Sequence, residues 1–258
     1  MRPSPTTPAL ETRGLTIRFG GHVAVDRVSC SFSPGTLTAI VGPNGAGKTT
    51  YFNLVSGQLR ATSGHVLVDG RDITGLPASA RARRGLGRAF QLTNLFPQLT
   101  ALENVRLAVQ SRADAGWSLL QVWNDRRDLI EKAQAILERV RLSDKRHVAP
   151  KALSHGDQRK LEVALLIAME PKVFMFDEPT AGMSVDEVPT VLELIHDIKQ
   201  RGDATVLLVE HKMDVVRSLA DRIVVLHNGS LVADGEPAAV IASPVVQQAY
   251  LGLEAGHA

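Results

Sequence analysis

The residues best suited to chemistry form one glycine-rich loop between an apolar run and a helix-like stretch. The loop matches the pattern G-x-x-x-x-G-K-[ST] and consists of Gly42, Pro43, Asn44, Gly45, Ala46, Gly47, Lys48, Thr49 and Thr50. Glycine lets the backbone come close to a polyphosphate with successive N–H groups directed at the anion. Lys48 adds a positive charge, and Thr49 adds a hydroxyl for Mg²⁺ at the β- and γ-phosphates. The loop therefore predicts a bound nucleoside triphosphate with Mg²⁺ rather than a plain turn.

Two adjacent carboxylates follow an apolar run at residues 173–176. A buried strand there would deliver Asp177 and Glu178 to a carboxyl end, where parallel sheets bind ligands. Asp177 suits the metal shell, whereas Glu178 points differently and can hold and deprotonate a water aimed at the γ-phosphate. Such a pair is a weak signal alone, but behind a phosphate loop it predicts phosphoryl-transfer chemistry.

A third group of polar residues comes before a stretch with apolar residues at helical spacing. In Leu153-Ser154-His155-Gly156-Asp157-Gln158, Ser154 can cap the helix that follows. Free N–H groups at the start of that helix would make a second anion site. A plain helix cap is the alternative interpretation.

Composition limits the classes of function. Of the 258 residues, 44% are hydrophobic and 22% are charged, which is typical of a globular protein with a sizeable core. The formal net charge is +2 and basic residues are interleaved with acids, so no nucleic-acid footprint is expected. For the densest basic cluster we expect a solvated helix face, with a phosphate or headgroup contact as the alternative: Arg81, Arg83, Arg84 and Arg88.

Neither a disulfide nor a membrane span is predicted. Cys30 is the single cysteine and lies in an apolar run, so we interpret it as a small core residue in a reducing compartment. The longest apolar run, residues 163–169, is far shorter than a bilayer span, and the amino terminus has no signal pattern. We therefore expect that the chain does not cross a membrane by itself.

The elements that must position these residues alternate between strand and helix patterns. The pattern predicts an antiparallel pair of strands at residues 10–19 and 23–32, which are joined at Gly20-Gly21. It also predicts the strand that enters the phosphate loop at residues 36–41. Further strands are expected at 65–68, 173–176, 205–209 and 222–226, with a hairpin at Asn228-Gly229 into 230–233. Helices at 185–200 and 213–220 between the later strands indicate a parallel sheet.

A block without strand signals, residues 92–141, lies between the strand expected at 65–68 and the strand expected at 173–176. Thr100 and Glu103 have the capping-box spacing and open a helix that runs to about Arg112. Residues 118–141 have helical periodicity, with charges opposite an apolar stripe. The loop at residues 92–100, before the first of these helices, is apolar at Leu92, Leu95, Phe96 and Leu99, and one interpretation of it is a core strap.

Together the motifs resemble those of an ATP-binding subunit of an ATP-binding-cassette (ABC) transporter. The segment LSHGDQ resembles that family's LSGGQ signature, with His155 in place of its first glycine. The resemblance implies that four residues contact the nucleotide held by the opposite subunit: Ser154, His155, Gly156 and Gln158. It also implies an α/β fold, with a P-loop NTPase core around a mostly parallel sheet, an N-terminal antiparallel β subdomain and a helical subdomain.

The remaining family motifs follow in order over residues 10–252. Phe19 matches the aromatic residue that stacks on adenine, and Val25 is expected among the nucleotide contacts. Gln91 matches the glutamine that meets Mg²⁺ and changes place with the transmembrane partner, and His211 matches the switch histidine that senses the γ-phosphate. Ser184 replaces the aspartate of the family's SALD segment, so communication between the two ATP sites is expected to differ.

Several sequence features resemble particular branches of the ABC transporter ATPases. Phe19-Gly20-Gly21, the long helical block, EHKMDVV from Glu210 and the ending AYLG at 249–252 resemble the longer ATPase of high-affinity branched-chain amino-acid importers. LSHG and AGM also resemble the urea and short-chain amide branch. The YLG ending is shared with lipopolysaccharide-export ATPases, so export is the alternative. No residue of this chain names the cargo.

Soluble ATPases of the same superfamily, which act on DNA or ribosomes, are the alternative from another class. The chain has neither the long coiled coils or zinc modules of the first nor the paired cassettes of the second. Small GTPases share the phosphate loop but need an Asn-Lys-x-Asp that is absent from the sequence. Transport is therefore the favoured interpretation.

The resemblance implies the organisation and the partners. Residues 1–8 are expected to be a flexible tail, and 9–258 a single ABC ATPase domain with an antiparallel subdomain at 9–35 and 64–75 and a helical subdomain at about 92–168. The implied partners are transmembrane permease subunits, a second ATPase (a paralogue or a second copy) and, in an importer, a periplasmic solute-binding protein, with no nucleic acid. The resemblance makes the loop at 92–100 the expected seat for a helix of the membrane subunit, as the alternative to a core strap. The implied location is peripheral, on the cytoplasmic face of the bacterial inner membrane.

Overall fold

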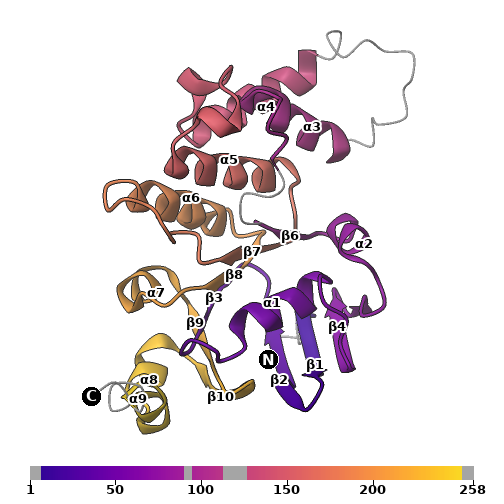
Figure 1. The fold of residues 1–258 in the computed structure, drawn as a ribbon, viewed down its shortest axis with the longest axis vertical. Coiled ribbons are helices and arrows are strands. Elements are labelled where there is room, and N and C mark those ends of the chain that lie inside the picture. Colours follow the sequence, from indigo (N-terminus) through magenta and orange to yellow (C-terminus); the bar gives the residue numbers. More distant parts are fainter. Residues whose placement is uncertain (1–6, 90–94, 113–126, 252–258) are drawn as a thin grey trace, which may run out of the picture. The chain divides into compact units, whose positions relative to one another are not determined.

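The computed structural model describes residues 7–89, 95–112 and 127–251 (Figure 1). These residues divide into two compact units. One unit comprises Met1–Arg88, Lys172–Glu178 and Ile198–Ala258, and the other comprises Ala89–Pro171 and Pro179–Asp197. Within the described ranges, no helix combines the length and the apolar character needed to cross a bilayer.

The first unit is built on a six-stranded sheet in the order β10-β9-β3-β8-β7-β6. Its strands are β3 (Leu37–Val41), β6 (Leu86–Arg88), β7 (Val173–Asp177), β8 (Thr205–Val209), β9 (Arg222–His227) and β10 (Ser230–Gly235). All pairs are parallel except β9 with β10, which form the hairpin predicted at Asn228-Gly229. The mostly parallel sheet of the predicted fold class is confirmed.

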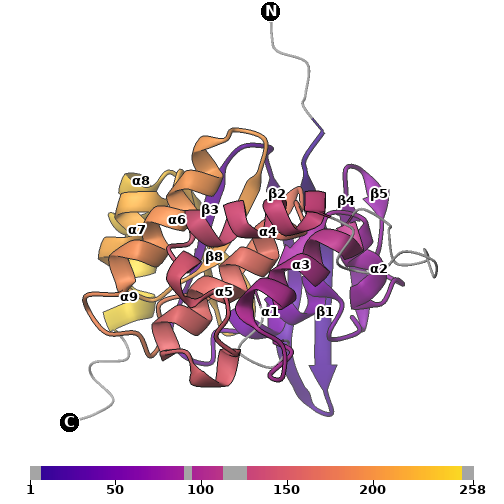
Figure 2. The same cartoon turned by 90° about the horizontal axis from the view of Figure 1, so that it is seen from above.

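Both faces of this sheet are covered, which explains why its strands read as continuous apolar runs. On one face, Ile40 and the neighbouring strands pack against α1 (Lys48–Ser56) and the antiparallel sheet. On the other face, Ala39 and Val41 pack against α7 (Met213–Leu219), α8 (Pro237–Ile241) and α9 (Pro244–Leu251), which lie next to one another in Figures 1 and 2. The alternation of β3 side chains thus serves two separate cores.

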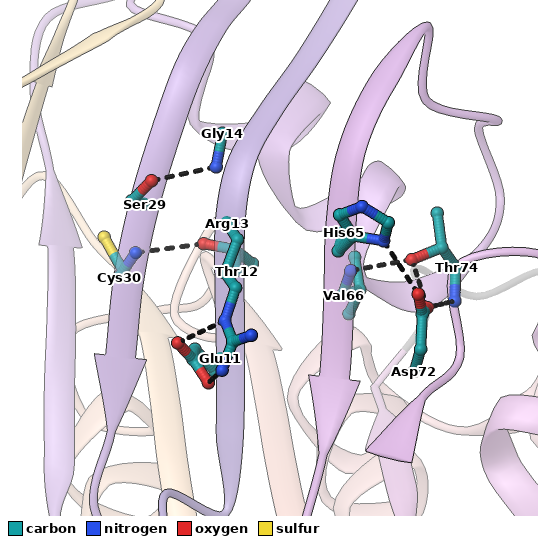
Figure 3. Close-up of polar contacts among 10 residues, drawn as sticks. All are labelled: Glu11, Thr12, Arg13, Gly14, Ser29, Cys30, His65, Val66, Asp72 and Thr74. Carbon is teal, nitrogen blue, oxygen red and sulfur yellow. Dashed lines mark hydrogen bonds and ion pairs between the residues drawn. The ribbon is translucent and has the colours of Figure 1, made fainter. Parts of the chain in front are cut away.

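The same unit carries a four-stranded antiparallel sheet in the order β2-β1-β4-β5. The strands are β1 (Leu10–Phe19), β2 (His22–Phe32), β4 (Ser63–Val68) and β5 (Arg71–Asp72). The β1–β2 register shifts between Thr12 and Leu15, where Gly14 has φ 55° and its N–H donates to Ser29 Oγ at 2.8 Å (Figure 3). The predicted antiparallel pair is confirmed.

Cys30 of β2 lies in the core, as predicted from the sequence. Cys30 is 4% exposed, and its backbone N–H donates to Thr12 Oγ1 at 3.1 Å (Figure 3). Burial raises the pKa of Cys30 to about 11. The side chain therefore behaves as a small apolar core residue.

The second unit is helical in its larger part. It contains α3 (Ala101–Arg112), α4 (Arg127–Arg139), two short 3-10 turns (Ser143–Lys145 and Pro150–Ala152) and α5 (His155–Ala168), with most of α6 (Val188–Gln200). Thr100 Oγ1 accepts from the Glu103 N–H at 3.2 Å and Glu103 Oε2 accepts from the Thr100 N–H at 2.7 Å, which confirms the capping box. The predicted helix over 118–141 is present from Arg127, and its earlier part lies outside the described residues.

The interpretation of the arginine cluster as a solvated helix face is wrong for two of its members. Arg81 lies on α2 (Ala78–Arg83) and is only 3% exposed, because its Nη1 donates to Leu54 O and Val55 O at 2.7 Å each and so satisfies the end of α1. Arg88 lies on β6, and its side chain is 7% exposed. Arg83 and Arg84 are exposed.

Candidate functional site

The phosphate loop joins β3 to α1 and is shaped by its glycines. Gly42, Gly45 and Gly47 have φ of 150°, 80° and 95°. A Cβ at Gly42 would lie 2.1 Å from Leu226 O, and one at Gly47 would lie 2.5 Å from Ala24 O, so no other residue fits at these two positions. No side chain caps the amino terminus of α1, which leaves its first N–H groups for a ligand.

Lys48 is folded back over this loop. The residue is 6% exposed, and its Nζ donates to Gly42 O at 2.7 Å and to Pro43 O at 2.9 Å. Burial lowers the pKa of Lys48 from its ordinary value, while the charges of Glu178 and Asp177 act in the opposite direction. The loop thus holds a buried cation beside an uncapped helix, an arrangement suited to a polyphosphate.

The other residues of the loop differ in exposure. Asn44, Gly45 and Thr49 are exposed, whereas Pro43 and Ala46 are buried and Thr50 is half-buried. Because Thr49 lies in the first turn of α1, its hydroxyl is accessible beside the free N–H groups. The structure therefore brings together the residues that the motif predicts for triphosphate binding.

Asp177 and Glu178 lie at the carboxyl end of β7, as predicted, and their surroundings differ. Asp177 Oδ2 accepts from Arg88 Nη2 at 2.6 Å, and both side chains are nearly buried. Glu178 has a left-handed backbone with φ 48°, and its N–H donates to Val209 O at 3.0 Å. A non-glycine residue in this conformation is held by its surroundings and is common at functional sites.

His211 follows β8 and lies between two carboxylates. Its Nδ1 is 3.9 Å from Glu178 Oε1 and 3.5 Å from Glu210 Oε2. Glu210 is fully buried, and its Oε2 accepts from the backbone N–H groups of His211 and Lys212 at 2.8 and 3.2 Å. The structure thus places His211 beside Glu178, and it adds Glu210, which we did not predict although it precedes His211 directly.

The two other predicted nucleotide contacts lie on β1 and β2. Phe19, at the end of β1, is 51% exposed, so it does not belong to the core. Val25 is fully buried, and a Cβ at Gly47 would lie 3.6 Å from its Cγ2. Phe19 therefore offers an exposed aromatic face, while Val25 lies beside Gly47 of the phosphate loop.

The residues of the signature-like segment belong to the second unit. Ser154 Oγ accepts from the Asp157 N–H at 3.1 Å, so the predicted cap of α5 is present. His155 is exposed at the first position of the helix. Gln158 Nε2 donates to Pro150 O at 3.0 Å and Leu153 O at 3.1 Å, which ties the preceding turn to the helix.

A carboxylate that we did not predict lies against this segment. A Cβ at Gly156 would lie 2.2 Å from Glu187 Oε1, so a side chain at position 156 would displace the carboxylate. Ser184, the residue that departs from the family's SALD, donates from Oγ to Glu187 Oε2 at 3.0 Å. Glu187 therefore contacts both motifs of the second unit.

Gln91 and Leu92 lie outside the described residues, so their predicted roles rest on the sequence. The part of their loop that is described is held by Asn104 of α3, whose Oδ1 accepts from the Phe96 N–H at 2.8 Å and whose Nδ2 donates to Phe96 O at 3.1 Å. Phe96 itself is 56% exposed. Over the described ranges, no group of three or more His, Cys, Asp or Glu residues is arranged to hold a metal ion.

Comparison with known proteins identifies the family. A family profile described as ABC transporter matches residues 25–181, which include the phosphate loop, the signature-like segment and Asp177-Glu178. The chain belongs to the ABC transporter family. The predicted family and the predicted enzyme class, a transporter ATPase, are both confirmed.

Relatives of this ABC transporter chain match it over nearly its whole length. The high-affinity branched-chain amino acid transport ATP-binding protein LivG of Escherichia coli is 37% identical over 250 residues, or 95% of this chain and 98% of that protein. The corresponding protein BraF of Pseudomonas aeruginosa is 38% identical with the same coverage. A probable LivG of Archaeoglobus fulgidus is 35% identical over 95% of this chain and 96% of its own length.

Solved structures agree with the assigned fold of the ABC transporter chain. A structure described as the ADP conformation of an ATP-binding cassette of an ABC transporter has a TM-score of 0.80 at 29% identity, over 95% of this chain and 98% of that one. A nucleotide-free ATP-binding cassette has a TM-score of 0.80 at 28% identity, over 94% and 98%. The predicted P-loop NTPase fold is confirmed, and nucleotide binding is a property of this family.

Proposed function

We propose that the chain is the ATP-binding and ATP-hydrolysing subunit of an importer for branched-chain amino acids or related amino acids and amides. The observation that carries this proposal is the match of 37 to 38% identity over 95% of the chain to proteins named for high-affinity branched-chain amino acid transport. These relatives favour import over the lipopolysaccharide-export alternative and over soluble ATPases of nucleic acid or the ribosome. The cargo of such an importer is chosen by its other subunits.

The residues present fit a nucleoside triphosphate and Mg²⁺. The free N–H groups at the start of α1 and the buried charge of Lys48 favour binding of an anion. The exposed Thr49 lies in the same turn of the helix. Mg²⁺ is usually held by one or two carboxylates together with substrate phosphates and water, rather than by a cage of protein side chains. Thr49, Asp177 and Gln91 would hold it here. When bound, Mg²⁺ neutralises charge that develops on the phosphates.

The side chains around Glu178 support a water-activating role for this residue. Its carboxylate is about one third exposed, so water can reach it, and its backbone is fixed in the left-handed region at φ 48°. His211, with Nδ1 3.9 Å from Glu178 Oε1, can orient the same water or sense the γ-phosphate. Glu178 then accepts the proton of the attacking water as a general base.

We propose further that the subunit works as half of a pair. Lys48 and the phosphate loop would hold a nucleotide from one side, and Ser154, His155, Gly156 and Gln158 of the opposite ATPase would contact it from the other. The opposite ATPase is a paralogue or a second copy of this chain. Permease subunits and a periplasmic solute-binding protein complete the importer, and the ATPase is peripheral on the cytoplasmic face of the inner membrane.

The test is uptake of labelled amino acids by cells that lack the chain and are complemented with it. Complementation with the wild type should restore high-affinity leucine, isoleucine or valine uptake, and Lys48→Ala should not, because it removes the cation of the phosphate loop. Urea and short-chain amides are measured in parallel as the related cargo. If growth and envelope integrity depend on Lys48 while uptake of all these solutes does not, the export alternative replaces the proposal.

A further inference from the structure

We propose that Arg88 is a positioning residue for the metal site, which orients Asp177 and ties it to the helix of the phosphate loop. The inference rests on the proposed role of Asp177 in the Mg²⁺ shell and adds to it a residue that the phosphate-loop and carboxylate motifs do not contain. Arg88 lies on β6, next to β7, where Arg88 pairs in register with Met175, two residues before Asp177.

The guanidinium group of Arg88 divides its donors between two elements. Nη2 donates to Asp177 Oδ2 at 2.6 Å, at the end of β7. Nη1 donates to Asn53 Oδ1 at 2.6 Å and Ser56 Oγ at 3.0 Å, both on α1, and to Gln58 Oε1 at 3.1 Å just beyond it. One rigid, planar group therefore fixes the distance between the proposed metal carboxylate and the helix that begins at Lys48.

The environment makes this link stiff. The side chains of Arg88 and Asp177 are 7% and 11% exposed, and the Arg88 guanidinium lies 5.6 Å from the centre of the Phe52 ring. Burial lowers the pKa of Arg88 from its ordinary value, and the Asp177 carboxylate acts in the opposite direction. Water competes poorly for a pair as buried as this one, so the carboxylate has one preferred orientation.

The orientation leaves one oxygen of Asp177 for another ligand. Arg88 occupies Oδ2, and among the described residues no hydrogen bond reaches Oδ1. Carboxylates that hold a metal are commonly fixed by a second hydrogen bond from an outer residue, and loss of that residue typically lowers metal affinity by about 10 to 100-fold. Arg88 meets this description, and it carries the constraint to α1 as well.

The experiment measures binding of a fluorescent ATP analogue to the full chain as a function of Mg²⁺, and again in EDTA. Arg88→Gln removes the charge and the planar fork. It should raise the Mg²⁺ concentration for half-saturation by about 10-fold or more, while affinity in EDTA changes less than about twofold. Arg88→Lys restores a charge without the fork, so it should lie between the wild type and Arg88→Gln.

Asn53→Ala is the matched control, because it removes one of the two 2.6 Å contacts of the same guanidinium group, while Ser56 Oγ still holds the group to α1 and the pair with Asp177 is kept. It should lower the melting temperature without changing the Mg²⁺ dependence. If Arg88→Gln and Asn53→Ala have the same effect on Mg²⁺ half-saturation, or neither has any, Arg88 is only a structural brace. If Arg88→Gln does not fold, the comparison of Arg88→Lys with Asn53→Ala decides by the same criterion.

Asp177→Asn separates this inference from the proposed function. An unchanged Mg²⁺ dependence in Asp177→Asn would remove Asp177 from the metal shell and would overturn both. A raised Mg²⁺ requirement in Asp177→Asn together with wild-type behaviour in Arg88→Gln would overturn the inference about Arg88 alone. A raised requirement in both variants, with normal binding in EDTA, supports it.

Discussion

Phe19 is a large aromatic side chain that the fold leaves half uncovered. It ends β1 at a turn made by Gly20-Gly21, so no side chain from the next two residues shields its ring. With 51% of the residue exposed, burial contributes little to its place in the structure. An exposed aromatic face of this kind can stack on a purine base.

Replacement of Phe19 by Ala should therefore weaken ATP binding and leave stability nearly unchanged. Stacking of a base on an aromatic ring contributes about 1 to 3 kcal/mol, and this is the expected loss in binding free energy. Isothermal titration with ATP measures it, with Phe19→Trp as the control that keeps an aromatic face. Binding of tripolyphosphate, which has no base, should be the same in all three proteins. An unchanged ATP dissociation constant in a folded Phe19→Ala protein would falsify the stacking role.

Single residues of the site were predictable where a motif fixes their chemistry, and not where the surroundings do. The phosphate-loop pattern predicts a phosphate site at the end of β3, and the apolar run before Asp177 and Glu178 predicts two carboxylates at the end of β7. The left-handed backbone of Glu178 has no sequence signal, because it depends on tertiary surroundings that include the contact of its N–H with Val209 O. Arg88 was misread for the same reason, since its partners lie 35 and 89 positions away in the sequence.

Strands β4 and β5, at one edge of the antiparallel sheet, are joined by a small polar cluster (Figure 3). Asp72 accepts from the Thr74 hydroxyl at 2.6 Å and from the Thr74 N–H at 2.8 Å, and Asp72 Oδ2 lies 2.7 Å from His65 Nδ1. Thr74 Oγ1 also accepts from the Val66 N–H at 2.8 Å. These polar contacts add to the packing of Val66, Val68 and Ile73 in the hydrophobic core at this end of the sheet.

The charge of Asp72 should make this cluster sensitive to acid. The Thr74 hydroxyl, then the Thr74 N–H and His65, lower the pKa of Asp72 from 3.8 to about 2. Because the folded-state pKa is depressed, the stabilising contribution is present above the unfolded-state value and is lost as pH falls toward about 2. The melting temperature of Asp72→Asn should therefore lie below that of the wild type at pH 6, and the gap should narrow steadily below about pH 4.

The side chain of Asp72 is 49% exposed, so the effect at pH 6 should be small. Calorimetry at several pH values between 6 and 3 measures the gap, and Asp26→Asn, a surface carboxylate at another place in the same sheet, is the control. A gap that stays constant down to pH 3 would show that the charge of Asp72 does not stabilise the fold.

The elements were predictable to the extent that their burial is regular. Strands covered on both faces, such as β8 and β9, read as apolar runs, and their limits were predicted to within one residue. The short helices α8 and α9 were not predicted, because five and eight residues give too little periodicity to recognise. Helix α2 was misjudged because Arg81 is buried by hydrogen bonds to the end of α1, a tertiary contact that overrides its polarity.

At the scale of the whole molecule, the described part of the loop before α3 presents an exposed apolar residue on a fixed backbone. Asn104 is 2% exposed and bonds both the N–H and the C=O of Phe96, so the loop keeps its shape while the Phe96 ring stays 56% exposed. An exposed aromatic side chain on a fixed loop can serve as a contact for another protein, because aromatic residues are enriched among the residues that dominate binding at interfaces. This agrees better with a seat for a membrane subunit than with a core strap.

Phe96→Asp should uncouple the ATPase from its membrane partner without unfolding it. Because the ring makes little buried contact, the melting temperature should change by no more than a degree or two, within the usual range of surface substitutions. Co-purification from detergent-solubilised membranes should fall strongly. Val245→Asp, at another apolar residue that is also 56% exposed, is the matched control and should co-purify normally. Aggregation of isolated Phe96→Asp protein would instead support the core strap.

The central proposed step is hydrolysis of ATP at the end of β7 with Glu178 as the general base. Glu178→Gln keeps the size of the side chain and an acceptor oxygen but loses the charge that polarises the water. The decisive measurement is the steady-state ATPase rate of this variant, with the partner subunits present and ATP affinity determined on the same samples.

The ATPase rate of Glu178→Gln should fall by about 10² to 10⁴-fold while ATP binds as tightly as in the wild type. ATP should then also hold two ATPase subunits together, which size-exclusion mass shows on the same samples. Turnover close to that of the wild type would contradict the role of Glu178 as the general base, and it would leave His211 as the first candidate to orient the water.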